Sequence, residues 1–173
     1  GLSIKTIGAI KLVALAYVLK FLWAPLLDRY STPILNRRRG WMLWTQVGIV
    51  IVLVLIGGLS PQTSLPAIAS LAVVLATLSA TQDIAVDAYR IEIGPIEAQG
   101  ALVATYSLGY RIALILAGAL ALILADHIAW SWIYVLMAAA MVVPIAGNLA
   151  AREPEVHRAL PGTWSDAMRG AIV

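Results

Sequence analysis

Two aspartates and one arginine follow a run of small apolar residues in the stretch SATQDIAVDAYRIE, residues 79 to 92. Five polar residues of this stretch recur at i, i+3, i+4, i+8 and i+11, and they are Ser79, Gln82, Asp83, Asp87 and Arg90. In a helix this spacing places them on one face. A sheltered carboxylate can carry a proton, and two carboxylates one turn apart can hold a cation. The spacing therefore predicts a polar stripe along one helix, and this stripe could bind a proton or a cation.

Arg111 interrupts the apolar segment that follows. It lies about twelve residues into that segment, which corresponds to a depth of roughly 18 Å if the segment is a membrane-spanning helix. A charge at that depth costs about 2.5 to 3.5 kcal/mol on insertion scales, so it requires a partner or water. A short loop joins the segments of Asp83 and Arg111, and we expect the guanidinium to reach toward Asp83. Asp87 and Arg90 could instead form an ion pair that simply ends their helix.

The composition indicates that lipid is the solvent for most of the chain. Of the 173 residues, 61% are hydrophobic and 12% are charged, and the mean hydropathy is +0.89. A soluble domain of this size cannot cover so much apolar surface with so few charges. Cysteine is absent, which excludes disulfides and thiolate metal sites. We expect no cofactor and, at a modest net charge of +3, no nucleic acid partner.

Five apolar segments are each long enough, at about 20 residues, to cross a hydrocarbon layer about 30 Å thick. They are predicted at residues 5–27, 40–59, 66–91, 99–125 and 130–150, and residues 151–173 are predicted to form a cytoplasmic tail or linker. All five are expected to be helices, because backbone polar groups in lipid must be satisfied within the segment. Lys and Arg gather in alternate loops, which places those loops in the cytoplasm and the start of the chain outside. Lys20 is expected to extend to the membrane surface. The predicted fold is an all-α membrane helix bundle within the lipid bilayer.

The run KFLWAPLLDRY, followed by NRRRGWML, resembles the loop between the second and third helices of major facilitator transporters. The family pattern is Gly, three residues, Asp-Arg and then a basic cluster. The matching residues are Asp28, Arg29, Arg37, Arg38 and Arg39, while Ala24 replaces the Gly and the spacing to the cluster is longer. The resemblance implies that this loop latches a cytoplasmic gate against the opposite half of the transporter.

The run ATQDIAVDAYRIE is more specific, and together with KFLWAPL it resembles the AmpG muropeptide permeases, a family related to acetyl-CoA transporters. The resemblance covers nearly the whole chain and implies helices two to six of a twelve-helix major facilitator transporter. It also implies a proton symporter of the bacterial inner membrane that imports GlcNAc-1,6-anhydro-MurNAc peptides for peptidoglycan recycling. Because the chain begins with Gly1 and has an odd number of spans, we expect a fragment whose partner is the missing remainder of the same transporter.

The resemblance further implies that the polar stripe lines a central cavity. There we expect Asp83 to bind the coupling proton, because it lies deeper than Asp87. Ser79 and Gln82 would hydrogen-bond sugar hydroxyls and amides. The next span would add Arg111, which would meet a carboxylate of the peptide, and Tyr106 and Tyr110, which could stack on a sugar ring or serve only for packing.

Two alternatives stay open. A carrier of the same superfamily for another solute, such as acetyl-CoA, would need a dense cationic cavity for several phosphates. An intramembrane enzyme for lipid phosphotransfer would use Asp83 and Asp87 to hold Mg²⁺, but such an enzyme would carry a longer acidic array than this chain has. We therefore expect a transporter rather than an enzyme.

Overall fold

The computed structural model describes residues 13–154, and the regular structure in that range is entirely helical. The elements are η1 (Leu19–Leu22), α2 (Ala24–Arg29), α3 (Arg38–Gly57), α4 (Leu65–Ile93), η2 (Ile96–Ala98), α5 (Gln99–Leu114), the π-helix η3 (Ile115–Leu120), α6 (Ala121–Ala125), α7 (Trp130–Ala140) and α8 (Val142–Ala150). The prediction of an all-α fold is confirmed for this part of the chain.

Four helices are long and apolar enough to cross a membrane, at Arg38–Gly57, Leu65–Ile93, Ile96–Ala125 and Trp130–Ala150. Their bounds lie close to those of the last four predicted spans. The first predicted span, 5–27, begins outside the described residues and continues as an apolar helix at Val13–Leu22. Most of the predicted tail, residues 155–173, also lies outside the described part of the chain.

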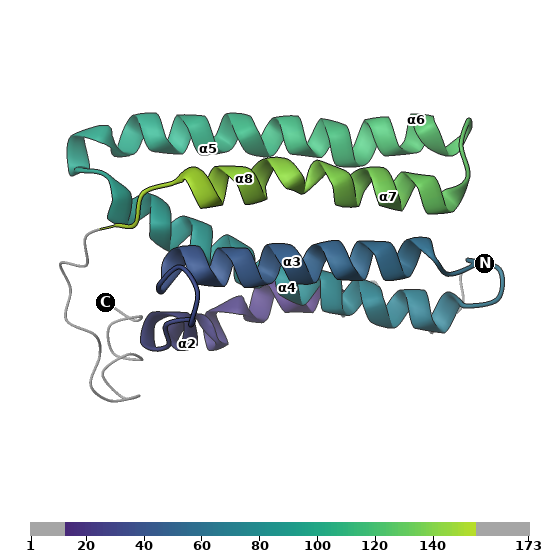
Figure 1. Cartoon of the computed structure of the whole chain (residues 1–173), viewed down its shortest axis with the longest axis horizontal. Coiled ribbons are helices and arrows are strands. Elements are labelled where there is room, and N and C mark those ends of the chain that lie inside the picture. The colour runs from purple at the N-terminus through teal and green to yellow at the C-terminus, as the bar shows by residue number, and fades with distance from the viewer. Residues whose placement is uncertain (1–12, 155–173) are drawn as a thin grey trace.

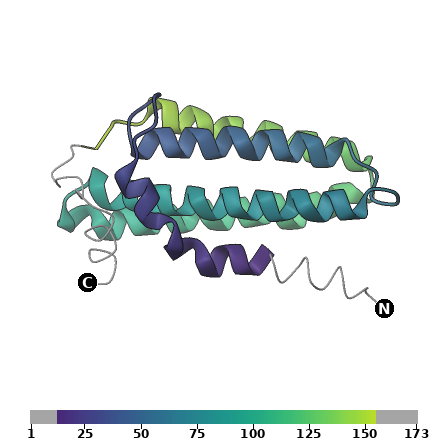
Figure 2. The same cartoon turned by 90° about the horizontal axis from the view of Figure 1, so that it is seen from below.

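Helix α3 is the centre of the bundle, and it packs against α4, α7 and α8 (Figure 1). The helix Val13–Leu22 lies against α4 on the side away from α3, so that these three helices form successive layers (Figure 2). The second half of α5 and the π-helix η3 are the least covered part of the described chain, because every residue from 107 to 120 is exposed.

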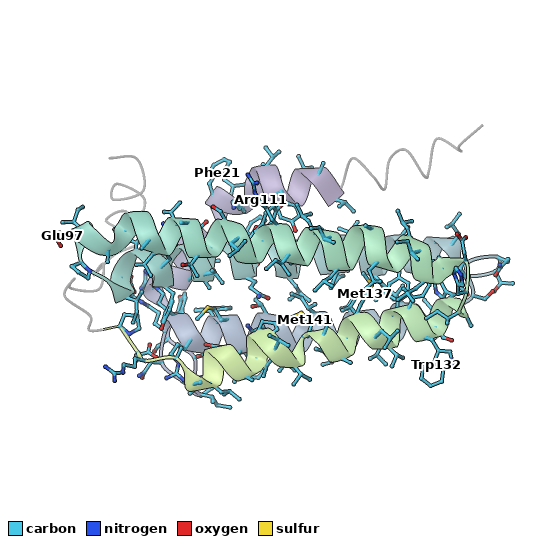
Figure 3. The ribbon with its side chains drawn as sticks, turned by 90° about the horizontal axis from the view of Figure 1, so that it is seen from above. Phe21, Glu97, Arg111, Trp132, Met137 and Met141 are labelled. Atoms are coloured by element: carbon cyan, nitrogen blue, oxygen red, sulfur yellow. The ribbon has the colours of Figure 1, made fainter. Side chains whose placement is uncertain are left out.

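Two apolar clusters hold α3 in place. One joins Leu27, Met42 and Ala85 at one end of α3. The other joins Ile49, Leu53 and Ala138, and Met137 and Met141 pack against it (Figure 3). Burying large side chains in this way contributes about 1.5 to 3 kcal/mol each in aqueous folding. In a membrane the close fit of small residues carries more of the stability than burial does.

Gly57 provides a direct test of that close fit between α3 and α7. A Cβ atom at this position would lie 2.9 Å from Tyr134 Cβ and 3.3 Å from the Ser131 carbonyl oxygen. We therefore expect Gly57→Ala to lower the stability by about 1 to 3 kcal/mol, measured as thermal unfolding in detergent. The matched control is Gly147→Ala in α8, where an added Cβ would meet no atom of another described segment within 4 Å, and it is expected to be neutral or slightly stabilising. Equal unfolding temperatures of the two variants would contradict this packing.

Candidate functional site

The predicted polar stripe lies on one face of α4. Its members Ser79, Gln82, Asp83 and Asp87 are half-buried. The opposite face of α4 packs on α3, where the Leu78 side chain would meet a Cβ at Gly48 at 3.1 Å and Ala85 is fully buried. Because the apolar face holds α4 against α3, the stripe is turned toward the helix Val13–Leu22 and the start of α5.

A hydrogen bond fixes the register of the first helix against α4. Trp23 Nε1 donates to Thr81 Oγ1 at 3.1 Å. Six residues earlier, Tyr17 lies close to Ser79 and within electrostatic range of Asp83 and Tyr110. The first helix therefore brings its own polar side chains to the stripe, which local spacing within residues 79–92 does not reveal.

Among the described residues, the charged side chains within electrostatic range of Asp83 are those of Lys20 and Asp87. Arg111 forms no ion pair with Asp83, so the predicted approach of these two side chains is wrong. Figure 3 shows Arg111 on the side of α5 that faces away from α7 and α8, and its side chain is exposed. Lys20 is half-buried in the 3₁₀-helix η1, which contacts α4. That its ammonium extends to the membrane surface stays a prediction.

Arg90 joins the stripe to α5. Its Nη2 atom lies 3.5 Å from Asp87 Oδ1, which confirms the predicted ion pair. Its guanidinium also lies over the Tyr106 ring, 5.8 Å from the centroid. Cation–π contacts of this kind are worth about 0.5 to 2 kcal/mol. The described residues leave the buried Gln82 Oε1 atom without a hydrogen-bond partner.

A second group of charges lies where α3 begins and α4 ends, and we call it the basic end. The Arg38 guanidinium donates to both carboxylate oxygens of Glu92, with Nε at 3.0 Å from each. Its Nη1 atom lies 2.7 Å from Asp28 Oδ1. Arg37 Nη2 contacts Glu92 Oε1 at 3.3 Å. Glu92 thus binds two arginines of the predicted gating loop to the end of α4.

Glu92 is not among the site residues that the sequence predicts. It falls on a different face of α4 from the stripe, so helical spacing does not connect it with Asp83 or Asp87. The order of the helices along the chain could have indicated the position of Glu92. Two consecutive antiparallel helices place the end of α4 beside the start of α3, where three arginines stand in a row.

Arg39 serves a different purpose from its two neighbours. Its Nε and Nη2 atoms donate to the carbonyl oxygens of Asn148 and Leu149, both at 3.0 Å, and thereby cap the end of α8. Asn148 Nδ2 donates in return to the Arg39 carbonyl oxygen at 3.0 Å. Arg39 Nη1 also lies 3.8 Å from Glu153 Oε2. Burial raises the pKa of the Glu153 carboxyl, and Arg39 opposes that rise.

A cavity of about 430 Å³ opens at the basic end. Its lining consists of Arg29, Ser31, Asn36, Arg37, Arg38, Glu92, Glu153 and Pro154. The loop above it is held by Thr32, whose Oγ1 donates to the carbonyl oxygens of Ile34 and Asn36, both at 2.8 Å. Leu35 and Asn36 have positive φ values of 61° and 53°, a conformation that costs a leucine about 1 to 3 kcal/mol.

Comparison with known proteins shows what the chain is similar to. Residues 2–166 match the family described as Major Facilitator Superfamily. The chain is 45% identical over 169 residues to the "Anhydromuropeptide permease" of Escherichia coli strain K12, which covers 97% of the chain and 34% of that protein. It is 44% identical over 156 residues to an uncharacterized protein of Haemophilus influenzae, covering 90% of the chain and 37% of that protein. It is 35% identical over 163 residues to "Putative transporter AmpG 4" of Rickettsia felis, covering 91% of the chain and 39% of that protein. The chain thus spans about a third of the length of these curated relatives.

Proposed function

Because the chain belongs to the Major Facilitator Superfamily, we propose that it forms part of a permease that imports anhydro-muropeptides into bacteria for peptidoglycan recycling. The observation that carries this proposal is the 45% identity to an anhydromuropeptide permease along almost the whole chain. The four membrane-capable helices and the family make it a multi-pass membrane protein. We place it in the bacterial inner membrane, where the substrate would enter the cytoplasm with a proton, and we propose that the remaining helices of the transporter surround this chain.

The polar stripe is the proposed site of substrate and proton. Asp83 would take up the coupling proton, because a half-buried carboxylate beside other polar groups can change its protonation during transport. Ser79 would hydrogen-bond hydroxyls or amides of the sugar. Gln82 supports the same role, since its buried Oε1 is an acceptor that the described residues leave free. A substrate donor could satisfy this atom and so recover its desolvation cost.

Helix α5 would supply the remaining contacts. Tyr106 is half-buried and already holds the Arg90 guanidinium, whereas Tyr110 is more exposed and is available to a sugar ring. Arg111 projects from the uncovered part of α5, and we propose that it meets a carboxylate of the peptide or a group of the remaining helices.

The basic end is the proposed cytoplasmic gate. Arg37 and Arg38 contact Glu92, and Arg38 also contacts Asp28. Because Arg39 in addition contacts the end of α8, the ends of these helices would move together as a rigid body. Arg29 is exposed beside them, over the ring of Tyr30, and it is the loop arginine most free to contact the opposite half. Rocking of one rigid half against the other would then give alternating access.

The alternatives gain less support from the structure. A carrier of acetyl-CoA would need several cations for the phosphates, and the described cations near the stripe are few: Lys20 and Arg90, with Arg111 farther along α5. A magnesium-dependent phosphotransferase would need a larger acidic group. Within residues 13–154 no three acidic, His or Cys side chains come together in a way that could hold a metal ion, and Asp87 is paired with Arg90.

Uptake by the protein that the gene encodes in full would test this function. We expect proteoliposomes with an inward proton gradient to accumulate labelled GlcNAc-1,6-anhydro-MurNAc tripeptide, because the gradient drives import of the substrate with the proton. A protonophore should abolish accumulation while leaving exchange of internal for external substrate. Accumulation of acetyl-CoA in place of the muropeptide would favour the alternative carrier, and accumulation that resists the protonophore would contradict proton symport.

A further inference from the structure

Lys20 occupies an unusual position for a lysine in an apolar segment. The chain is α-helical from residue 13 to 18, tightens into the 3₁₀-helix η1 over Leu19–Leu22, and becomes α-helical again at Ala24. A short 3₁₀ stretch inside a longer helix often marks a functional position. The Trp23 to Thr81 hydrogen bond then fixes this stretch on α4 beside the stripe. Lys20 is therefore a half-buried residue of a segment that lies against α4.

Because η1 contacts α4, Lys20 lies within electrostatic range of Asp83. The other groups facing Asp83 are Asp87 on the same helix, Tyr17 on the first helix and Tyr106 on α5. Within residues 13–154 no carboxylate lies within 4 Å of the Lys20 ammonium, so the described structure leaves its three N–H donors open. The ammonium is thus close enough to feel the charge of Asp83 but is not locked in an ion pair with it.

The two arginines of this region are not equivalent to Lys20. Arg90 is held by Asp87 at 3.5 Å and lies over the Tyr106 ring. Arg111 is on the uncovered part of α5 and forms no ion pair with Asp83. Among the cations of residues 13–154, Lys20 is consequently the one beside the stripe that can exchange one negative partner for another.

We propose that Lys20 binds a carboxylate of the peptide substrate when Asp83 becomes protonated. This inference rests on the proposed function of the stripe. While Asp83 is ionised, its charge offsets that of Lys20, and a substrate carboxylate would be repelled by Asp83. Once Asp83 is neutral, the ammonium attracts the substrate carboxylate instead, so that proton and anionic substrate each favour the binding of the other. This exchange of partners would couple the two without any covalent step.

The test compares two substrates in the full gene product reconstituted in liposomes. One substrate is the anhydro-muropeptide with free peptide carboxylates, and the other is the same compound with those carboxylates amidated. We expect Lys20→Gln to weaken the apparent affinity for the carboxylate form by about tenfold or more, because it removes a hydrogen bond between charged groups. The affinity for the amidated form should change little, and Lys20→Arg should keep most of the preference for the carboxylate.

A binding measurement that does not depend on transport completes the design. In detergent, the carboxylate substrate should raise the unfolding temperature of the wild type and Lys20→Arg, and more so at pH 6 than at pH 8. In Lys20→Gln both the shift and its pH dependence should be lost. Equal effects of Lys20→Gln on both substrates, or no effect, would overturn the role of Lys20 while wild-type uptake still supports the permease. If the wild type neither binds nor transports either substrate, the proposed function fails together with this inference.

Discussion

Asp83→Asn is expected to abolish gradient-driven accumulation of anhydro-muropeptide while leaving exchange of substrate across the membrane largely intact. Asparagine has nearly the shape of aspartic acid but cannot release a proton, so it mimics the protonated state at all pH values. Exchange needs only the movement of loaded carriers, whereas accumulation needs the proton to leave on the inside. Because the neutral side chain also leaves Lys20 unopposed, binding of the carboxylate substrate should persist and should lose its dependence on pH.

The matched control for this variant is Asp87→Asn, one helical turn away on the same face of α4. Asp87 is paired with Arg90 at 3.5 Å, so its loss is expected to reduce transport in both modes by a smaller factor rather than to separate them. Initial rates of accumulation and of exchange, measured in the same liposomes, distinguish the two patterns. Undiminished accumulation by Asp83→Asn would remove Asp83 from the coupling step.

The sequence predicts the helices well because lipid imposes a simple rule. An apolar run long enough to cross the bilayer must satisfy its backbone within itself, so hydropathy alone places α3 and α4 close to their observed bounds. The polar stripe follows from the same kind of local regularity, since residues at i and i+4 share a face whatever surrounds the helix. Features that depend on one helix at a time are therefore readable from the sequence.

Contacts between helices are not readable in this way. The direction of Arg111 depends on how α5 is turned about its axis, and the neighbour of Asp83 depends on where the first helix crosses α4. Local spacing contains neither quantity. Pro25 marks a break in the first helix, but local spacing does not show that the 3₁₀ stretch before it lies beside the stripe. The pairing of Glu92 with Arg38 joins residues that are 54 positions apart.

The stripe and the basic end are joined by α4 itself. Asp83 and Glu92 belong to the same helix, so a movement of α4 that follows protonation at the stripe would carry the Glu92 carboxylate with it. The arginines held by Glu92 would then move relative to the opposite half of the transporter. This gives a physical route from proton binding to the gate that needs only a rigid helix. It also means that the contacts of Glu92 must be strong enough to transmit the movement.

Glu92→Gln should therefore be the most destabilising single change at the basic end, lowering the stability by about 3 kcal/mol. The Arg38 side chain is 8% exposed, and the variant would leave its guanidinium with Asp28 alone while Arg37 loses its contact as well. Removing one partner of a buried ion pair costs more than the pair contributes, because the other charge stays out of water. Thermal unfolding of the purified protein in detergent would measure the loss.

Glu97→Gln is the matched control, since Glu97 is exposed in η2 at the same end of the bundle and has no ion pair within the described residues (Figure 3). It should unfold like the wild type. Replacing both partners, as in Arg38→Met with Glu92→Met, should recover part of the stability, because the buried Arg38 guanidinium is then absent, even though Asp28 and Arg37 each lose one contact. If Glu92→Gln proves as stable as Glu97→Gln, the carboxylate does not hold α4 to the arginines. That result would contradict the proposal that α4 transmits a movement from Asp83 to the gate.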